Sequence, residues 1–159
     1  MVPTASRAPA AHQHRHDAKA FVRDVSRVCG ERGLRLTPIR LRVLELLAES
    51  TVPVKAYDLL DDLKDGPGAA APPTVYRALD FLLEHGFIHK LESINAFVGC
   101  HHPGESHQVP FLICDRCASA IEICDERVAD LLTRQARDRG FTPAGQTLEV
   151  HGLCADCTR

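Results

Sequence analysis

Two C-x-x-C pairs constrain the fold of this chain more than any other feature. The first pair, Cys114 and Cys117, lies in the stretch "FLICDRCASAIEIC" (residues 111–124), and the second, Cys154 and Cys157, lies almost at the chain end. Each pair bends over a tight turn that aims both sulfurs at one point, and four thiolates make the common closed zinc site of proteins. Because 36 residues separate the pairs, the fold between them has to bring them together. The alternative is two unrelated thiol pairs.

The chain's length and composition indicate a reducing environment for these cysteines. The 159 residues suit one domain or two small ones. Residues 1–16 lack the apolar core of a signal peptide, and no run approaches 18 apolar residues, so we expect a cytoplasmic protein with no membrane span. There, C-x-x-C pairs bind metal more often than they form disulfides. A closed four-cysteine zinc site has no open coordination position, so it is expected to fasten the chain end and to catalyse nothing.

Residues 17–100 have the pattern of a winged helix-turn-helix domain. Apolar residues recur at helical spacing in four stretches. Thr37 can cap the second helix and Pro38 suits its first position, while Gly33 and Gly86 end the first and fourth helices. Two short strands, "FIHKL" and "AFVGC", are expected around a turn near Ile94–Asn95. The four helical stretches are residues 17–32, "LTPIRLRVLELLAE", "AYDLLDDLK" and "PPTVYRALDFLLEHG".

A second unit of different character follows Cys100. The polar stretch "HHPGESH" (residues 101–107) is the expected hinge, and residues 108–159 form a small α/β unit. Its expected elements are strands in "VPFLIC", "AIEIC" and "QTLEVHGLC" and a helix capped by Asp125 in "DERVADLLTRQARDRGF". The fold class is therefore α+β, and residues 1–16, rich in Ala, Pro, His and Arg, are expected to be disordered.

Positive charge is concentrated at the front of the chain. Residues 1–42 hold nine Lys and Arg against three Asp and Glu, whereas residues 43–100 hold four against nine. The spacing of Lys19, Arg23 and Arg27 puts them on one face of a helix. They suit contacts to DNA phosphates, although a solvated helix face is the ordinary interpretation of such a stripe.

The fourth helix has a polar face that could read DNA. Its buried stripe is expected at Val75, Leu79, Leu82 and Leu83, which leaves Thr74, Tyr76, Arg77 and Asp80 on another face. Arg77 is the leading candidate for a contact to a base edge, with Thr74 and Tyr76 on phosphate or a thymine methyl. Burial of Tyr76 against the third helix is the alternative.

A second set of metal ligands is spread around the hinge. His89 and Cys100 flank the expected hairpin symmetrically, so a two-residue turn would place them opposite each other. His107 lies in the hinge and Glu122 on the strand after the first C-x-x-C pair. A thiolate, one or two imidazoles and a carboxylate suit zinc, and ligands from both units would fix the angle between them. Each residue could instead be an ordinary core or surface side chain, and His101 and His102 are alternative ligands.

These motifs together resemble a known family. "RLTPIRLRVLELL", "AYDLLDDL", "PPTVYRALDFLLEHGFIHKLES", "ICDRC" and "HGLCADC" closely resemble the ferric uptake regulator family, and within it the zinc uptake regulator branch, over residues 20–157. The resemblance implies a bacterial homodimeric repressor whose winged helix binds a roughly palindromic DNA operator and whose C-terminal domain dimerises. It implies two zinc ions per chain. The structural ion would lie on Cys114, Cys117, Cys154 and Cys157, and the sensing ion on His89, Cys100, His107 and Glu122.

Other functions fit the sequence less well. An iron- or peroxide-responsive regulator of the same family is the main alternative, but the thiolate of Cys100 favours zinc over ferrous iron. A zinc-bound redox switch built on the C-x-x-C pairs is a second. An enzyme is not expected: no histidine is followed two residues on by Glu, as a zinc deaminase needs, and there is no His-Glu-x-x-His, Walker loop or Gly-x-Ser-x-Gly motif.

Overall fold

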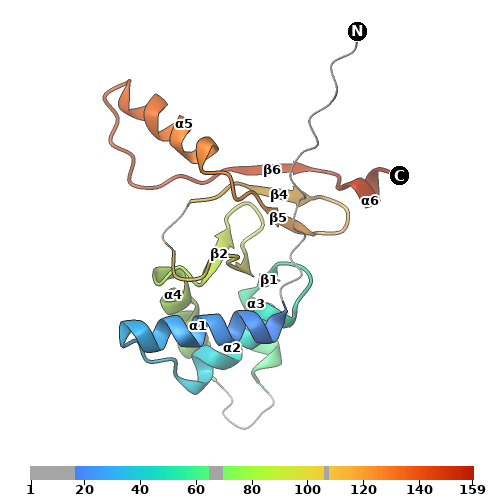
Figure 1. Cartoon of the computed structure of the whole chain (residues 1–159). Coiled ribbons are helices and arrows are strands. Elements are labelled where there is room, and N and C mark those ends of the chain that lie inside the picture. The colour runs from blue at the N-terminus through green and yellow to red at the C-terminus, as the bar shows by residue number, and fades with distance from the viewer. Residues whose placement is uncertain (1–16, 65–69, 106–107) are drawn as a thin grey trace.

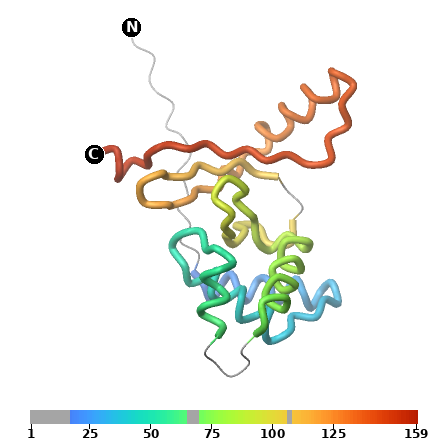
Figure 2. Tube along the Cα trace, turned by 180° about the vertical axis from the view of Figure 1, so that it is seen from behind, coloured from blue at the N-terminus to red at the C-terminus, as the bar shows by residue number. Residues whose placement is uncertain are grey.

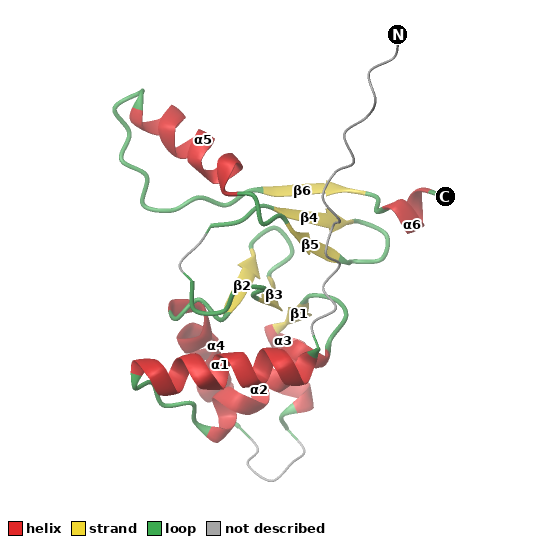
Figure 3. Ribbon diagram, in the orientation of Figure 1, coloured by secondary structure: helices red, strands yellow, loops and turns green. Residues whose placement is uncertain are grey.

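The computed structural model describes residues 17–64, 70–105 and 108–159. The chain combines helices with two small sheets, which confirms the α+β class, and the expected elements occur in the expected order (Figures 1 and 3). The helices are α1 (Ala18–Arg32), α2 (Pro38–Glu49), α3 (Ala56–Asp62), α4 (Pro72–Glu84), α5 (Glu126–Arg137) and α6 (Ala155–Thr158). The strands are β1 (Val54–Lys55), β2 (Ile88–Leu91), β3 (Ala96–Gly99), β4 (Phe111–Cys114), β5 (Ala120–Glu122) and β6 (Glu149–Gly152). The expected disorder of residues 1–16 lies outside the described residues.

The helix boundaries follow the signals in the sequence, with one difference. Asp17 caps α1 through its carboxylate, which accepts hydrogen bonds from the Lys19 and Ala20 amides, and Gly33 ends the helix at a φ of 66°. Thr37 occupies the cap position of α2, but its side chain makes no capping hydrogen bond, so Pro38 at the helix start is the stronger signal there.

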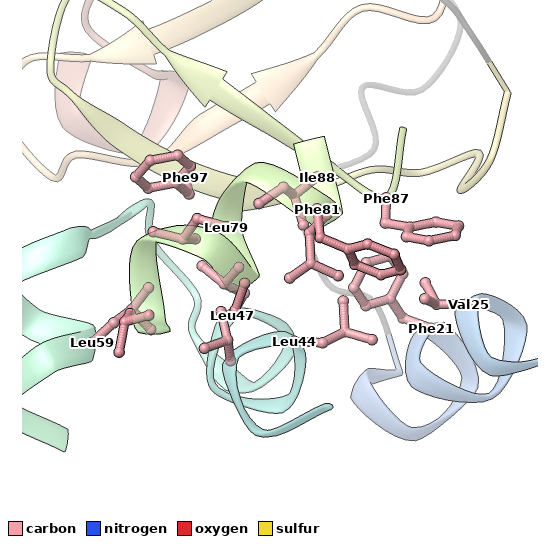
Figure 4. Close-up of a cluster of buried hydrophobic side chains, with 14 of the residues drawn as sticks. Phe21, Val25, Leu44, Leu47, Leu59, Leu79, Phe81, Phe87, Ile88 and Phe97 are labelled. Carbon is pink, nitrogen blue, oxygen red and sulfur yellow. The ribbon is translucent and has the colours of Figure 1, made fainter. Parts of the chain in front are cut away.

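The main hydrophobic core lies where helices α1 to α4 meet. Phe21 and Val25 of α1 point toward Leu44 of α2 (Figure 4). The aromatic side chains of α4, of the residue just before β2 and of β3 complete the cluster; they are Phe81, Phe87 and Phe97. Apolar residues at i, i+3 and i+4 of these helices supply the buried faces, as the periodicity predicts. The core therefore holds α4 by its apolar side and leaves the opposite side in solvent.

The first sheet has the order β1-β3-β2, and its hairpin differs from the expected one. The turn spans the four residues 92–95, with Asn95 at a φ of 48°, instead of two residues. The register therefore pairs His89 with Val98, and the expectation that His89 lies directly opposite Cys100 was wrong. The two residues are diagonal neighbours on one face, because Cys100 lies two residues beyond Val98.

The second sheet has the order β5-β4-β6, with β4 and β6 parallel. Helix α5 forms the long connection between β5 and β6, and it projects away from the rest of the chain (Figure 1). None of the residues of α5, all of which are described, is buried. The parallel pairing runs Cys114 alongside Gly152, so the second C-x-x-C pair emerges next to the first.

The β2–β3 hairpin packs directly against the second sheet, as the views from both sides show (Figures 1 and 2). Leu91 and Val98 of the hairpin form one buried cluster with Phe111, Ile113 and Ala120 of the second sheet. This contact joins the hairpin to the second sheet through apolar side chains. Because it is small, further bonds across it affect how firmly the two sheets are held.

The start of the expected hinge contacts α1 and the turn that follows α4. The Gly104 amide donates to the Gly86 carbonyl at 3.0 Å, and the Arg32 guanidinium donates to the Gly104 carbonyl. A Cβ atom on Gly104 would lie 2.8 Å from Val28 Cγ1, and the φ of Gly104 is 86°, so only glycine fits this close approach. No described helix is long and apolar enough to cross a membrane.

Candidate metal centres and DNA-facing surface

The four cysteines of the two C-x-x-C pairs converge at the end of the second sheet. Their Sγ atoms all lie within 4.8 Å of one another, and those of Cys117 and Cys154 are 3.8 Å apart. A tetrahedron with Zn–S bonds of about 2.3 Å has sulfur–sulfur edges of about 3.8 Å. Cys114 ends β4 and Cys117 lies in the turn that follows it, while Cys154 is the N-cap residue of α6 and Cys157 lies within that helix. The arrangement fits one zinc ion in a closed site.

The pKa values of the thiols in this cluster differ widely. The backbone amides of Cys117 and Cys154 donate to the Cys114 sulfur and lower the pKa of its thiol to about 6. The hydrogen bond from Cys157 to Cys154 raises the pKa of the Cys157 thiol to about 12. Thiolates at these distances repel one another, so each deprotonation makes the next one harder. A bound cation is therefore needed to keep all four as thiolates.

A second ligand set joins the two sheets. His89 of β2, Cys100 just after β3 and Glu122 at the end of β5 place one ligand atom each within 4.8 Å of one another. His89 Nε2 lies 3.8 Å from Glu122 Oε1. The ring of His89 is also held edge-on by Phe111 of the second sheet, with ring centroids 5.4 Å apart. A thiol, an imidazole and a carboxylate at this spacing fit a zinc ion.

Most of this set is buried, whereas Cys114 alone is buried among the four cysteines. Cys100 is 0% exposed and Glu122 is 4% exposed. Burial, and after it the charge of Glu122, raises the pKa of the Cys100 thiol to about 12. The thiol therefore stays protonated at neutral pH until a metal displaces its proton. A buried carboxylate beside a neutral thiol and an imidazole makes a pocket that favours a cation.

The other expected hinge ligands are placed differently. The backbone amide of His101 donates to Glu122 Oε2 at 3.2 Å, and the His101 ring belongs to neither of the ligand groups that the described residues form around Glu122. His102 lies in a separate group with Glu122 and Cys124. His107 lies outside the described residues, so its expected role as the third or fourth ligand stays a prediction.

Two features of the site were missed by the sequence analysis. Cys124 faces Glu122, with its Sγ donating to Oε1 at 3.9 Å. The spacing of two residues along a strand could have revealed it, because such residues share a face. The second feature is a polar contact between the sheets: the Glu149 carboxylate accepts hydrogen bonds from the Glu92 and Ser93 amides, at 2.6 Å and 3.0 Å. No sequence signal relates these distant positions.

The predicted DNA-facing residues are all at the surface. Thr74, Tyr76 and Arg77 lie exposed on α4, and Tyr76 is 49% exposed, so the alternative of its burial was wrong. Lys19, Arg23 and Arg27 are exposed along α1. Arg27 is engaged by Glu31 at 2.7 Å, which reduces the positive charge it offers to a phosphate.

Comparison with known sequences decides the family. Residues 31–151 match the sequence model of the Ferric uptake regulator family. The chain belongs to the ferric uptake regulator family. Within the family, the chain is 48% identical over 132 residues to the zinc uptake regulation protein of Escherichia coli (strain K12), a match that covers 82% of this chain and 77% of that protein.

Solved structures of family members agree with the fold. The structure of holo XcZur, 62% identical, superposes with a TM-score of 0.82 and covers 87% of this chain and 97% of that chain. A zinc uptake regulator complexed with zinc and DNA, 44% identical, gives a TM-score of 0.84 over 90% of this chain and 96% of that chain. The structure of apo XcZur gives only 0.54 at the same 62% identity, over 90% of this chain and 99% of that chain. The structure of this chain is therefore more similar to that of holo XcZur than to that of apo XcZur.

Proposed function

We propose that this protein is a zinc-responsive, sequence-specific DNA-binding repressor of zinc uptake genes, in which zinc at the hinge fixes the arrangement of the two units. The observation that carries the proposal is the ligand set of His89, Cys100 and Glu122, whose members come from both sheets. A metal held there binds better when the sheets are close, so it shifts the population toward that arrangement. The coupling is reciprocal, so DNA tightens zinc at the hinge.

The two forms of XcZur support a role for metal in this arrangement. This chain matches holo XcZur far better than apo XcZur, although the sequence identity is the same. The difference between those two structures therefore concerns how their parts are arranged. The zinc uptake regulator bound to zinc and DNA also fits this chain with a high TM-score. We infer that the closed arrangement described above is the DNA-binding one.

The parts of the chain have the roles that the family pattern implies. Residues 17–100 bind DNA, residues 101–107 are the hinge, and residues 108–159 dimerise and hold the structural zinc. Large apolar residues exposed on the second unit support dimerisation, because so many in one small unit mark a contact surface. They are Leu112, Leu131, Leu132, Phe141, Val150 and Leu153. Two-fold symmetry implies a roughly palindromic operator.

Each chain holds two zinc ions with separate roles. Cys114, Cys117, Cys154 and Cys157 hold the structural ion, and His89, Cys100 and Glu122 hold the regulatory ion, with His107 as a further ligand. The four-cysteine site offers no position for a substrate, which agrees with a regulator and not an enzyme. Because its partner is the bacterial chromosome, the protein acts in the cytoplasm of a bacterium.

On α4, Arg77 contacts a base edge, and Thr74 and Tyr76 contact phosphate or a thymine methyl. Lys19 and Arg23 add phosphate contacts from α1, and Arg27 contributes less because of Glu31. The iron- or peroxide-responsive alternative is disfavoured by the thiol of Cys100, which suits zinc better than high-spin ferrous iron.

Metal stoichiometry paired with DNA binding tests the proposal. The purified protein is measured for zinc before and after dialysis against a weak chelator, and each form selects duplexes from a random DNA library. We expect two zinc ions per chain, loss of one with the chelator, and selection of a palindromic sequence by the two-zinc form alone. Equal selection by both forms would show that hinge zinc does not control DNA binding.

A further inference from the structure

Glu122 faces two ligand sets at once, and only one of them is the buried hinge set. We propose that His102, Glu122 and Cys124 form a loading site, where zinc from solution first binds before it passes to His89 and Cys100. The inference deepens the proposed function, because it rests on the hinge set as the final site. It assigns a role to Cys124, a thiol outside both expected zinc sites.

The geometry of the second set fits a metal. His102, Glu122 and Cys124 offer one ligand atom each, all within 4.8 Å of one another. Glu122 Oε1 lies 3.9 Å from Cys124 Sγ and 3.8 Å from His89 Nε2, so the same oxygen faces both sets. Ligand atoms around one tetrahedral zinc lie under about 4 Å apart, which these side chains reach with small rotations.

Accessibility distinguishes the two sets. Cys100 is fully buried and Glu122 almost so, whereas both His102 and Cys124 are exposed. A hydrated or chelated zinc ion carries ligands that cannot pass into a buried pocket, so the ion has to shed them stepwise in exchange for protein ligands. A set with three protein ligands and an open position permits such exchange, while a closed set does not.

The surroundings of the exposed set attract cations. His102 and Cys124 line a cleft together with four carboxylates and Arg127, and Asp125, one of those carboxylates, pairs with Arg127. The carboxylates in the cleft are those of Glu105, Asp125, Glu126 and Asp130. Like charges that line a concave surface raise the local concentration of the opposite ion. Zinc therefore accumulates where His102 and Cys124 can bind it.

The transfer balances without any redox step. In the loaded state, zinc is bound by the His102 imidazole, the Glu122 carboxylate and the Cys124 thiolate, and the Cys100 thiol holds its proton. On transfer, the bonds to His102 and Cys124 break while bonds to His89 and Cys100 form. The Cys100 proton passes to the Cys124 sulfur, directly or through water, and Glu122 stays bound throughout. Net charge is unchanged, and the loading site is then ready for release or reloading.

A second hollow offers the competing route. His89 also lines a separate, smaller hollow with His85, Gly86 and Glu105. No thiol lines it, and the described residues there form no group of three close metal ligands. Zinc that entered by this hollow would meet His89 first and would not need Cys124. The two routes therefore predict opposite results: entry by the cleft is slowed by substitution of His102, and entry by the hollow is slowed by substitution of His85.

Loading kinetics test the proposal with a matched pair of variants. Protein that retains structural zinc but has an empty hinge is mixed with Zn²⁺ in a stopped-flow instrument, and uptake is followed by competition with a chromophoric chelator. His102→Gln and Cys124→Ser should each lose the fast phase of uptake yet reach the wild-type stoichiometry and hinge affinity. His85→Gln, the control in the hollow that His85 and His89 line, should load zinc at the wild-type rate.

Binding of Co²⁺ to a variant without Cys100 tests the loading site directly. In Cys100→Ser the final site has no thiolate, so Co²⁺ added to the protein should remain on the loading site and show a sulfur-to-cobalt charge-transfer band. The band should vanish in the Cys100→Ser, Cys124→Ser double variant. Structural zinc must be retained in both proteins, so that no cobalt enters the four-cysteine site.

Each outcome is decisive. Unchanged loading in His102→Gln and Cys124→Ser, slow loading in His85→Gln alone, or no cobalt–thiolate band in Cys100→Ser would overturn the loading site. A lower final stoichiometry in Cys124→Ser would make Cys124 a permanent ligand and would also overturn it. A wild-type protein that takes up no second metal would instead overturn the hinge site and the proposed function. Failure of the loading site and failure of the proposed function therefore give different results.

Discussion

The two candidate zinc sites of this chain are built on opposite principles. The four-cysteine site has only sulfur ligands, and one unit alone supplies them. The hinge set is mixed, buried and shared between two units. A site supplied by one unit can stabilise only that unit, whereas a shared site reports on the relation between two units. On the proposed assignment, the same metal would stabilise the fold in one site and act as a signal in the other.

Removing a cysteine from the closed site should have the largest effect. We expect Cys114→Ser to unfold the second unit and abolish the dimer, because a structural zinc contributes an apparent binding energy of about 10–16 kcal/mol that is also folding energy. Thermal unfolding and sedimentation velocity would measure this. A folded Cys114→Ser dimer that still responds to zinc would remove the distinction between the two sites.

Cys100→Ser is the matching change in the hinge set. Serine is a much poorer zinc ligand but nearly the same size, so the fold, the dimer and the structural zinc should survive. Zinc-dependent DNA binding should be lost, while weak binding at high protein concentration remains, because the closed arrangement is still visited as a minor state. The measurement is a zinc titration of DNA affinity by fluorescence anisotropy.

A wild-type zinc response in Cys100→Ser would contradict this assignment. Cys100 would then be only a buried thiol, and the hinge metal would depend on histidines. Cys29→Ser is the matched control, since Cys29 is also buried in the first unit and belongs to none of the close ligand groups among the described residues.

Arg77→Ala should weaken DNA binding without changing either zinc site. If Arg77 contacts a base edge, DNA affinity should fall by about 1–3 kcal/mol and preference should relax at one position of each half-site. Both zinc affinities should stay unchanged, because Arg77 is on the exposed side of α4. A competition assay against single-base operator variants would measure it. Uniform weakening with a shallower salt dependence would mean that Arg77 contacts phosphate only.

The sequence predicted the helices well because their signals are local. Apolar periodicity, Asp17, Pro38 and Gly33 act within a few residues, and α1 to α5 all lie where these signals put them. Strand β1 and helix α6 were missed, since two and four residues are too short to show a period.

The arrangement of the ligands was harder to predict. Nothing in the sequence showed that Asn95 would adopt a positive φ and extend the turn to four residues, yet that turn sets the register of His89. Cys124 and Glu149 depend on how the two sheets meet, which no local pattern determines. The four cysteines were the exception, because paired spacing alone indicates a shared centre.

Acidity should distinguish the two sites in solution. Burial, followed by the charge of Glu122, raises the pKa of Cys100 to about 12, so at neutral pH zinc has to displace its proton. Hinge affinity should therefore rise with pH, by about tenfold or about 1.4 kcal/mol for each unit between pH 7 and 8.5. Chelator competition at several pH values would measure the slope. A flat profile would mean that Cys100 is not a ligand, and Cys100→Ser should lose the slope.

The contact made by Glu149 uses no zinc ligand and consists of two hydrogen bonds at the surface, so its loss should have the smallest effect. Glu149→Gln keeps one acceptor for the Glu92 and Ser93 amides but removes the charge, a cost below about 1 kcal/mol at this partly exposed position. Part of that cost should appear as weaker DNA binding by the zinc-free protein and as a higher zinc requirement.

The pH dependence of this contact has a definite sign. Partial burial tends to raise the pKa of Glu149, but the hydrogen bonds from Ser93 and Glu92 outweigh it and the pKa is lowered. A carboxyl with a lowered pKa stabilises the folded arrangement above its unfolded pKa, and that contribution is lost as pH falls through the lowered value. The difference in Tm between wild type and Glu149→Gln should therefore shrink between pH 7 and pH 4. A difference that stayed constant would show that the carboxylate charge does not hold the hairpin turn, and that apolar packing of Leu91 and Val98 alone joins the units.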